Sequence, residues 1–194
     1  MKLLKYVVVH DTGLAPNPFW DYCTLAVCTP NHMNARLDLG DWIVGHSTKD
    51  TGNKLIYAME VNEILSFDEY FNDKRFQKKK PKKGSYMNYI GDNIYYRNSK
   101  NEWIWIPYSL HSDKRKLDTD HPRVFISKNF YYFGSNSIKE FRKLFPNLIK
   151  GEQGFSYERD IKAIDKFTSW LKKHHKAGRN NNMPTHIIKD IKLC

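Results

Sequence analysis

The chain has 194 residues, of which 40% are hydrophobic and 14% aromatic, and its net charge is +11. This composition is typical of a globular domain and excludes a disordered chain. No apolar run approaches the roughly 20 residues that a membrane helix needs, and no signal peptide is visible, so a cytoplasmic protein is expected. The positive charge favours polyanions such as nucleic acid or nucleotides, although Lys- and Asn-rich chains also arise from genome base composition.

The cysteine pattern argues against disulfides and metal sites. Cys23 and Cys28 lie on one expected strand, where a spacing of five residues points their side chains to opposite faces, so both are interpreted as buried packing residues. The paired Cys-x-x-Cys ligands of zinc sites are missing, as are a phosphate-binding glycine loop and a nucleophile elbow. We therefore predict no metal and no cofactor.

Short β-prone runs dominate the first two thirds of the chain. A loop rich in Gly, Pro and Asn fills residues 11–18, and Asp50-Thr51-Gly52-Asn53 is a good hairpin turn. Ser66 and Glu69 form a capping box that opens a short helix. The expected strands are residues 6–10, 22–28, 42–46, 55–65, 94–97, 103–107, 124–126 and 131–133.

Apolar residues at helical spacing predict two helices in the last third. The first follows a second capping box at Ser137 and is bent or ended by Pro146, and the second spans residues 158–175. Strands followed by helices indicate an α+β fold, built on a small curved antiparallel or mixed β-barrel with two C-terminal helices. A single domain is expected, with a β-rich core over residues 1–134 and a helical extension over residues 135–194.

Three polar clusters follow expected strands and are candidate ligand sites. In the first, His10, Asp11 and Thr12 end the first strand and Asn17 follows in the loop. The imidazole is suited to act as a general base or to bind a base edge, with the carboxylate orienting it. The alternative is a turn in which Asp11 and Thr12 hydrogen-bond their own backbone.

The second cluster follows the third expected strand. Trp42 is a candidate to stack on a base, with core packing as the alternative. The polar residues that end this strand are candidates to bind the edge of the base or a phosphate: His46, Ser47, Thr48 and Lys49.

In the third cluster, Asp92 and Asn93 carry the paired hydrogen-bonding groups that match base edges, and Tyr95 offers a stacking face. The alternative is a turn followed by an amphipathic strand. Residues 74–83 contain seven basic and no acidic residues and are expected to be an exposed loop, solvated or in contact with phosphate. The candidate phosphate ligands are Lys78, Lys79, Lys80, Lys82 and Lys83.

Seven motifs follow one another along the chain: residues 7–18, 22–26, 40–45, 55–59, 67–71, 91–95 and 124–134. In this order they resemble the nucleotide modification-associated domain, type 2. The resemblance covers about residues 5–134, and it links the chain to systems that make or handle modified bases in bacteria and their phages, without implying catalytic residues. A looser similarity runs from the glycine-aspartate turn at residue 40 through Ser47 and residues 55–65 to residues 68–70. It is to the PUA-like group with EVE and ASCH domains, whose barrel holds a modified or flipped base.

Three functions remain open from the sequence. The first is a non-enzymatic binding module with a pocket for a modified or flipped base, in which the polar clusters read the base and the basic loop holds phosphate. The second is an enzyme that acts on a nucleotide or base through His10 and Asp11. The third is a phage-type protein that sequesters a signalling nucleotide. All three place the protein in the bacterial cytoplasm or a phage-infected host, with a nucleic acid or nucleotide, and no membrane, as its partner.

Overall fold

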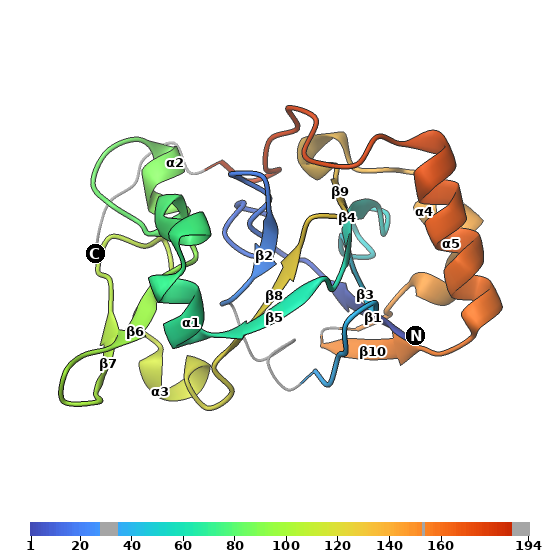
Figure 1. Ribbon diagram of the computed structural model, residues 1–194. Helices are drawn as coiled ribbons and strands as arrows, with labels where there is room; N and C mark the ends of the chain where they lie inside the picture. Colours follow the sequence, from blue (N-terminus) through green and yellow to red (C-terminus); the bar gives the residue numbers. More distant parts are fainter. Residues whose placement is uncertain (28–34, 153, 188–194) are drawn as a thin grey trace.

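The computed structural model describes residues 1–27, 35–152 and 154–187, and most of its strands form two sheets (Figure 1). In the five-stranded sheet β1 and β3 run parallel, and all other neighbours are antiparallel. Its order is β10 (Phe155–Glu158), β1 (Leu3–Val7), β3 (Trp42–His46), β4 (Leu55–Glu60) and β9 (Phe130–Tyr132). The three-stranded sheet has the order β2 (Cys23–Leu25), β8 (Arg123–Ser127) and β5 (Glu63–Ser66). A hairpin of β6 (Tyr95–Arg97) and β7 (Trp103–Trp105) stands apart.

A bent ribbon joins the two sheets. Tyr57 of β4 lies opposite Tyr132 of β9, and Glu63 of β5 lies opposite Ile126 of β8, so the two ladders keep one register. Asn62 stands at the bend, where its side-chain oxygen accepts hydrogen bonds from the backbone N–H groups of residues 128 and 129 at 2.8 and 3.2 Å. The β4–β5 and β8–β9 segments are therefore one long antiparallel pair that passes from one sheet into the other.

The elements pack in successive layers. Alternate side chains of β1 and β3 point to opposite faces: Leu3 and Trp42 face the helix α5 (Ile161–His174), while Leu4 and Ile43 face the three-stranded sheet. Figure 1 shows α5 along the outer side of the five-stranded sheet. The other side of the three-stranded sheet packs against α1 (Phe67–Asn72) and the β6–β7 hairpin.

The remaining helices are short. The capping box at Ser66 and Glu69 is confirmed, because each side chain accepts a hydrogen bond from the other residue's backbone N–H. The predicted box at Ser137 does not form, and the helix after it, α4 (Phe141–Leu144), stops before Pro146. The other short helices are η1 (Lys74–Lys79), α2 (Tyr86–Tyr89), α3 (Arg115–Asp118), η2 (Gly134–Asn136) and η3 (Pro146–Leu148).

The α+β class is confirmed, but several finer expectations are wrong. None of the sheets that the described residues form closes into a barrel, so the expected PUA-like barrel is not seen. The runs at 124–126 and 131–133, which the shortness of the segment between them would pair with each other as a hairpin, belong to different sheets as β8 and β9. Residues 155–158 form a strand on β1, so the segment after residue 134 is not purely helical. Cys23 is buried as predicted, whereas Cys28 lies outside the described residues.

Among the described residues, no helix has both the length and the apolar character required to cross a membrane.

Candidate functional site

A small cavity lies where the parallel strands β1 and β3 end. Val7 of β1 pairs with His46 of β3, so the loops that follow both strands begin side by side. In open sheets, the carboxyl ends of parallel strands are the usual place for a ligand. The cavity has a volume of about 160 Å³ and is lined by Val8, Val9, Ser47, Thr48, Thr51, Lys54, Ile56, Ser137, Thr185 and His186.

The lining combines hydroxyl groups with an apolar floor. Five of the ten lining residues are Ser or Thr, and three are Val or Ile. A hydroxyl can both donate and accept a hydrogen bond, so this wall can match donors as well as acceptors on a ligand. Thr48 and Thr51 bond to each other across the loop at 3.1 Å between their hydroxyl oxygens. The site is therefore equipped to bind a small, partly polar group.

Asp11 lies beneath the part of the cavity wall that Thr185 and His186 form, and it is fully buried. The Tyr132 hydroxyl donates to Oδ1 at 2.7 Å, and the backbone N–H and hydroxyl of Thr185 donate to Oδ2 at 3.0 and 3.2 Å. Burial raises the pKa of this carboxyl, and the three donors partly oppose that shift because they stabilise the charged form. Asp11 thus fixes the wall of the cavity and is closed off from solvent.

The partner of Asp11 is a late segment, residues 179–186, which we call the C-terminal strap. The strap passes very close to two glycines that have positive φ, Gly134 and Gly13. A Cβ on Gly134 would lie 2.1 Å from the Met183 carbonyl oxygen, and a Cβ on Gly13 would lie 2.7 Å from Pro184 Cγ. These positions admit only glycine without a shift of the strap.

The other members of the first cluster lie on the outside of this wall. His10 is exposed, and its ring packs edge-on against His186 with 5.5 Å between ring centroids. The carbonyl of Thr12 accepts a hydrogen bond from the Tyr86 hydroxyl at 2.5 Å. His10 and Asp11 are consecutive, but the described hydrogen bonds include none between their side chains.

The second cluster divides between the two faces of the sheet. Ser47 and Thr48 line the cavity, but His46 points to the opposite face and is fully buried. Its Nε2 accepts a hydrogen bond from the Lys150 backbone N–H at 2.8 Å, and burial lowers its pKa, so its ring is held neutral. Lys49 is exposed and lines a separate groove on that face.

The two aromatic candidates for base stacking are core residues. Trp42 is 3% exposed and packs in the layer between the five-stranded sheet and α5. Tyr95 is 2% exposed, lies on Phe67 with 5.5 Å between ring centroids and donates its hydroxyl to Asp118 at 2.7 Å. For Trp42 the structure agrees with core packing, the alternative that the sequence left open.

The third cluster joins a buried polar network away from the cavity. Asp92 accepts hydrogen bonds from the Thr24 hydroxyl at 2.6 Å and the Tyr70 hydroxyl at 2.8 Å, and burial raises its pKa. The Asn93 amide donates to the backbone carbonyls of residues 70 and 76. Asn17 donates its amide to the carbonyl of residue 90 at 2.7 Å. None of Asn17, Asp92 and Asn93 lines the cavity, and of the residues in the three predicted clusters only Ser47 and Thr48 do.

Only part of the basic run is exposed. Lys79 is fully buried, and its Nζ donates to the Asn17 side-chain oxygen at 2.7 Å and to the carbonyls of residues 17 and 22. Lys79 is therefore not open to a phosphate, contrary to the prediction. Lys80 is half-buried, with its Nζ 3.4 Å from the centroid of the Phe71 ring. The exposed members of the run are Lys74, Arg75, Lys78, Lys82 and Lys83.

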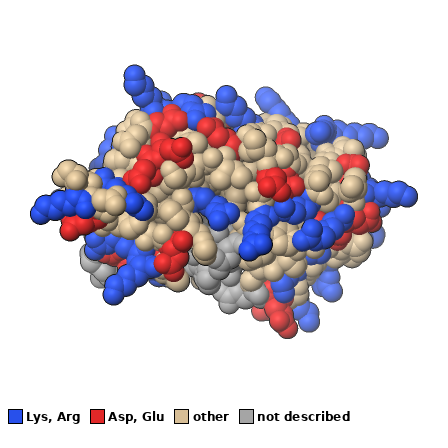
Figure 2. Space-filling model, turned by 60° about the horizontal axis from the view of Figure 1, so that its bottom comes forward, with Lys and Arg blue, Asp and Glu red and all other residues tan. Residues whose placement is uncertain are grey.

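Positive charge is spread over the molecule. Figure 2 shows Lys and Arg side chains around the rim and across one face, with acidic side chains between them. Residues 139–179 alone carry eleven Lys and Arg against five Asp and Glu. The excess charge is thus not confined to the run at residues 74–83.

Sequence reasoning missed the residues that complete the cavity. Ser137, Thr185 and His186 line it, and Tyr132 holds Asp11. The sequence marks Ser137 only as a helix cap and Tyr132 only as part of a strand, and no motif marks Thr185 or His186. The strap is polar and weakly patterned, and its contacts to Asp11 span 174 positions. The strap meets the loop at Asp11 only in the folded protein, so the sequence alone does not reveal this contact.

In a comparison with known families, the chain matches the model described as nucleotide modification associated domain 2 over residues 1–190. Neither the curated proteins nor the solved structures contain a match to this chain.

Proposed function

Because the chain belongs to the nucleotide modification associated domain 2 family, we propose that its cavity binds the modified base of a nucleotide. The observation that carries this proposal is the cavity at the ends of β1 and β3, with five hydroxyl side chains in its wall. A base is a flat ring whose edges carry both donors and acceptors, and hydroxyl groups match either kind.

The size of the cavity limits what enters it. Its volume of about 160 Å³ is below the roughly 300–1,000 Å³ of pockets that enclose drug-sized ligands. The cavity therefore takes the base or its substituent, and the sugar and phosphate remain outside. The net charge of +11 favours the approach of such an anionic ligand.

The proposal assigns binding and not a reaction. A general base must reach the proton that it removes, whereas Asp11 is fully buried and engaged by Tyr132 and Thr185. His10 is exposed, but it lies against His186 outside the cavity wall. These positions favour the binding module over the enzyme that uses His10 and Asp11.

The test is a binding titration with a panel of modified and unmodified nucleosides, preceded by mass spectrometry of any ligand that survives purification. The double variant Thr48→Val, Thr51→Val removes two hydroxyls while conserving shape. At about 1 kcal/mol for each lost hydrogen bond, affinity should fall about tenfold or more.

Thr168→Val is the matched control, because Thr168 lies on α5 and its hydroxyl donates to the carbonyl of residue 165, away from the cavity. This control should bind like the wild type. If no nucleoside binds the wild-type protein, or if the double variant binds as tightly, the cavity is not the base site.

A further inference from the structure

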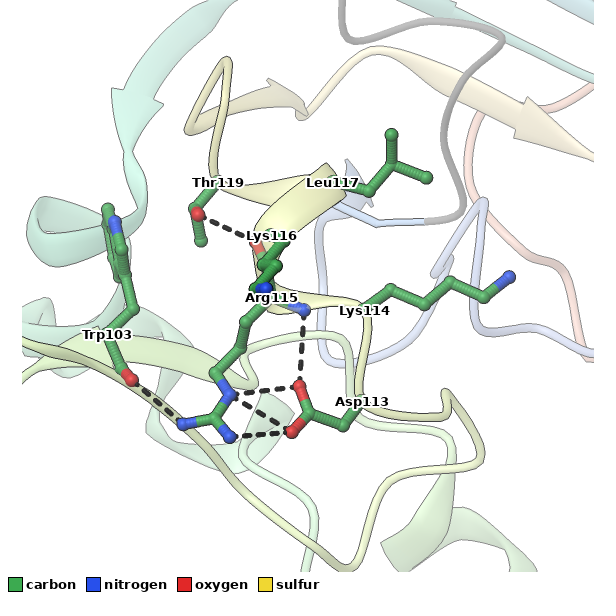
Figure 3. Close-up of a pocket in the computed structure, with 7 residues that line it drawn as sticks. All are labelled: Trp103, Asp113, Lys114, Arg115, Lys116, Leu117 and Thr119. Atoms are coloured by element: carbon green, nitrogen blue, oxygen red, sulfur yellow. Dashed lines mark hydrogen bonds and ion pairs between the residues drawn. The ribbon is translucent and has the colours of Figure 1, made fainter.

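Another concave surface lies on the opposite side of the three-stranded sheet from the five-stranded sheet, between β7 and α3. This groove has a volume of about 560 Å³ and shares no lining residue with the cavity. Figure 3 shows Trp103 on one wall and the turn of residues 113–119 on the other. Residues 113–119 belong to none of the sequence motifs or predicted clusters, and none of them lines the cavity, so neither the motifs nor the proposed function accounts for the groove.

The charges in the groove are not equivalent. Arg115 is fixed by Asp113, with 2.8 Å between its Nη2 and a carboxylate oxygen, and it also donates to the Trp103 carbonyl at 3.1 Å (Figure 3). The charges of Arg115 and Asp113 neutralise each other, and the hydrogen bond from Arg115 to Trp103 connects α3 to β7. Lys114 and Lys116 are exposed, and no carboxylate of a described residue lies within ion-pair distance of either. These two ammonium groups are therefore free to meet an external anion.

The other wall supplies an aromatic surface. Trp103 is half-buried, and the Arg97 guanidinium lies over its ring at 4.6 Å from the centroid. Arg97 is also exposed and pairs with Asp68 at 3.5 Å. Arg97 does not itself line the groove, but by lying on the Trp103 ring it extends the Trp103 wall, and unpaired bases stack on flat surfaces of this kind. The side chain of Leu117, 48% exposed, adds an apolar contact at the rim.

We propose that this groove binds a single-stranded polynucleotide, with Lys114 and Lys116 on its phosphates and the Trp103–Arg97 surface against its bases. An isolated phosphate would use the lysines but not the aromatic wall. A duplex keeps its bases stacked inside, so it would also leave that wall empty. The combination of free cations and an aromatic surface in one groove is what favours an unpaired strand.

The experiment measures fluorescence anisotropy of a labelled single strand of about 10 nucleotides, a length within the site sizes known for single folds. The test variant is Lys114→Gln, Lys116→Gln. The matched control is Lys78→Gln, Lys82→Gln, which removes the same charge from exposed lysines of the basic run. All four side chains are exposed, so both proteins should fold, and circular dichroism verifies this.

The groove variant should lose affinity by about tenfold, and its slope of log affinity against log salt should fall by about 1.4, or about 0.7 for each lost phosphate contact. The control should change far less. Equal losses in both variants, a loss confined to the control, or no binding by the wild type would overturn the proposal. So would a duplex that competes as well as the single strand.

This inference does not depend on the cavity. The groove variant should still bind nucleosides as the wild type does. If nucleosides fail to bind while the single strand binds through Lys114 and Lys116, the proposed function fails and the groove assignment stands.

Discussion

The substitution Lys79→Met tests the buried network most directly. It keeps an unbranched side chain as far as Cε and removes the ammonium group. Lys79 is fully buried, and its Nζ donates to the Asn17 side-chain oxygen at 2.7 Å, the Asn17 carbonyl at 3.0 Å and the Tyr22 carbonyl at 3.1 Å. The variant leaves these acceptors without their donor, and it removes the positive charge that favours the ionised form of Asp92.

Removing one partner from a buried charged network costs about 3–5 kcal/mol of unfolding free energy, because the groups left behind remain buried without compensation. In a domain of this size, each kcal/mol corresponds to about 2–4 °C in Tm. Lys79→Met should therefore lower Tm by about 6–20 °C. Lys78→Met is the control, because Lys78 is the exposed neighbour and its loss should change Tm very little.

The pH dependence gives a second, independent signature. Burial lowers the pKa of Lys79 to about 8 from its ordinary value of 10.5. Between these values the unfolded chain keeps a proton that the folded protein has released. The unfolding free energy of the wild type therefore gains a contribution from Lys79 as pH rises from about 8 to 10.5, amounting to roughly 3 kcal/mol. The variant should lack this rise.

The assay is urea unfolding followed by tryptophan fluorescence, at a series of pH values from neutral to 10.5, the ordinary pKa. The quantity of interest is the difference between wild type and variant, because other groups titrate in both proteins. A variant as stable as the wild type at neutral pH would refute the argument from lost hydrogen bonds. An identical rise with pH in both proteins would refute the depressed pKa.

Two further substitutions separate core from site. Trp42→Phe should lower the unfolding free energy by about 1–3 kcal/mol, which is less than full truncation costs. It should leave nucleoside affinity unchanged. A folded variant that loses affinity for nucleosides would instead place Trp42 at the site. Asp11→Asn replaces an acceptor oxygen with an amide that faces the Thr185 donors, so limited proteolysis with mass spectrometry should detect faster cleavage in residues 179–187. Unchanged cleavage would show that Asp11 does not hold the strap.

The helices α1 and α5 and the β3–β4 hairpin were predictable because their signals are local. The capping box at Ser66 acts within one turn, and the apolar stripe of α5 repeats every three or four residues. The same reasoning fails where one sequence pattern serves two sheets. Residues 55–65 read as one strand, and they are one arm of the ribbon, but the bend at Asn62 divides that arm between sheets. No local rule locates such a bend.

The candidate site shows the same limit. Ser47 and Thr48, which line the cavity, were predictable as candidates because polar residues follow an apolar strand. His46 belongs to the same run, yet the alternation of strand side chains sends it to the other face. Lys79 looked exposed because its neighbours in sequence are lysines. Its burial depends on acceptors from residues 17 and 22, which lie far away in the sequence.

The pairing of Asp11 with Thr185 also bears on how the molecule folds. The two residues are 174 positions apart, so this contact closes a loop that includes almost the whole chain. Contacts of such long range are slow to form because the entropy of loop closure must be overcome first. Until the strap docks, the Asp11 carboxylate can remain in water, and its desolvation belongs to the last step. We therefore expect the wall beside Asp11 to be the last part of the protein to order and the first to open.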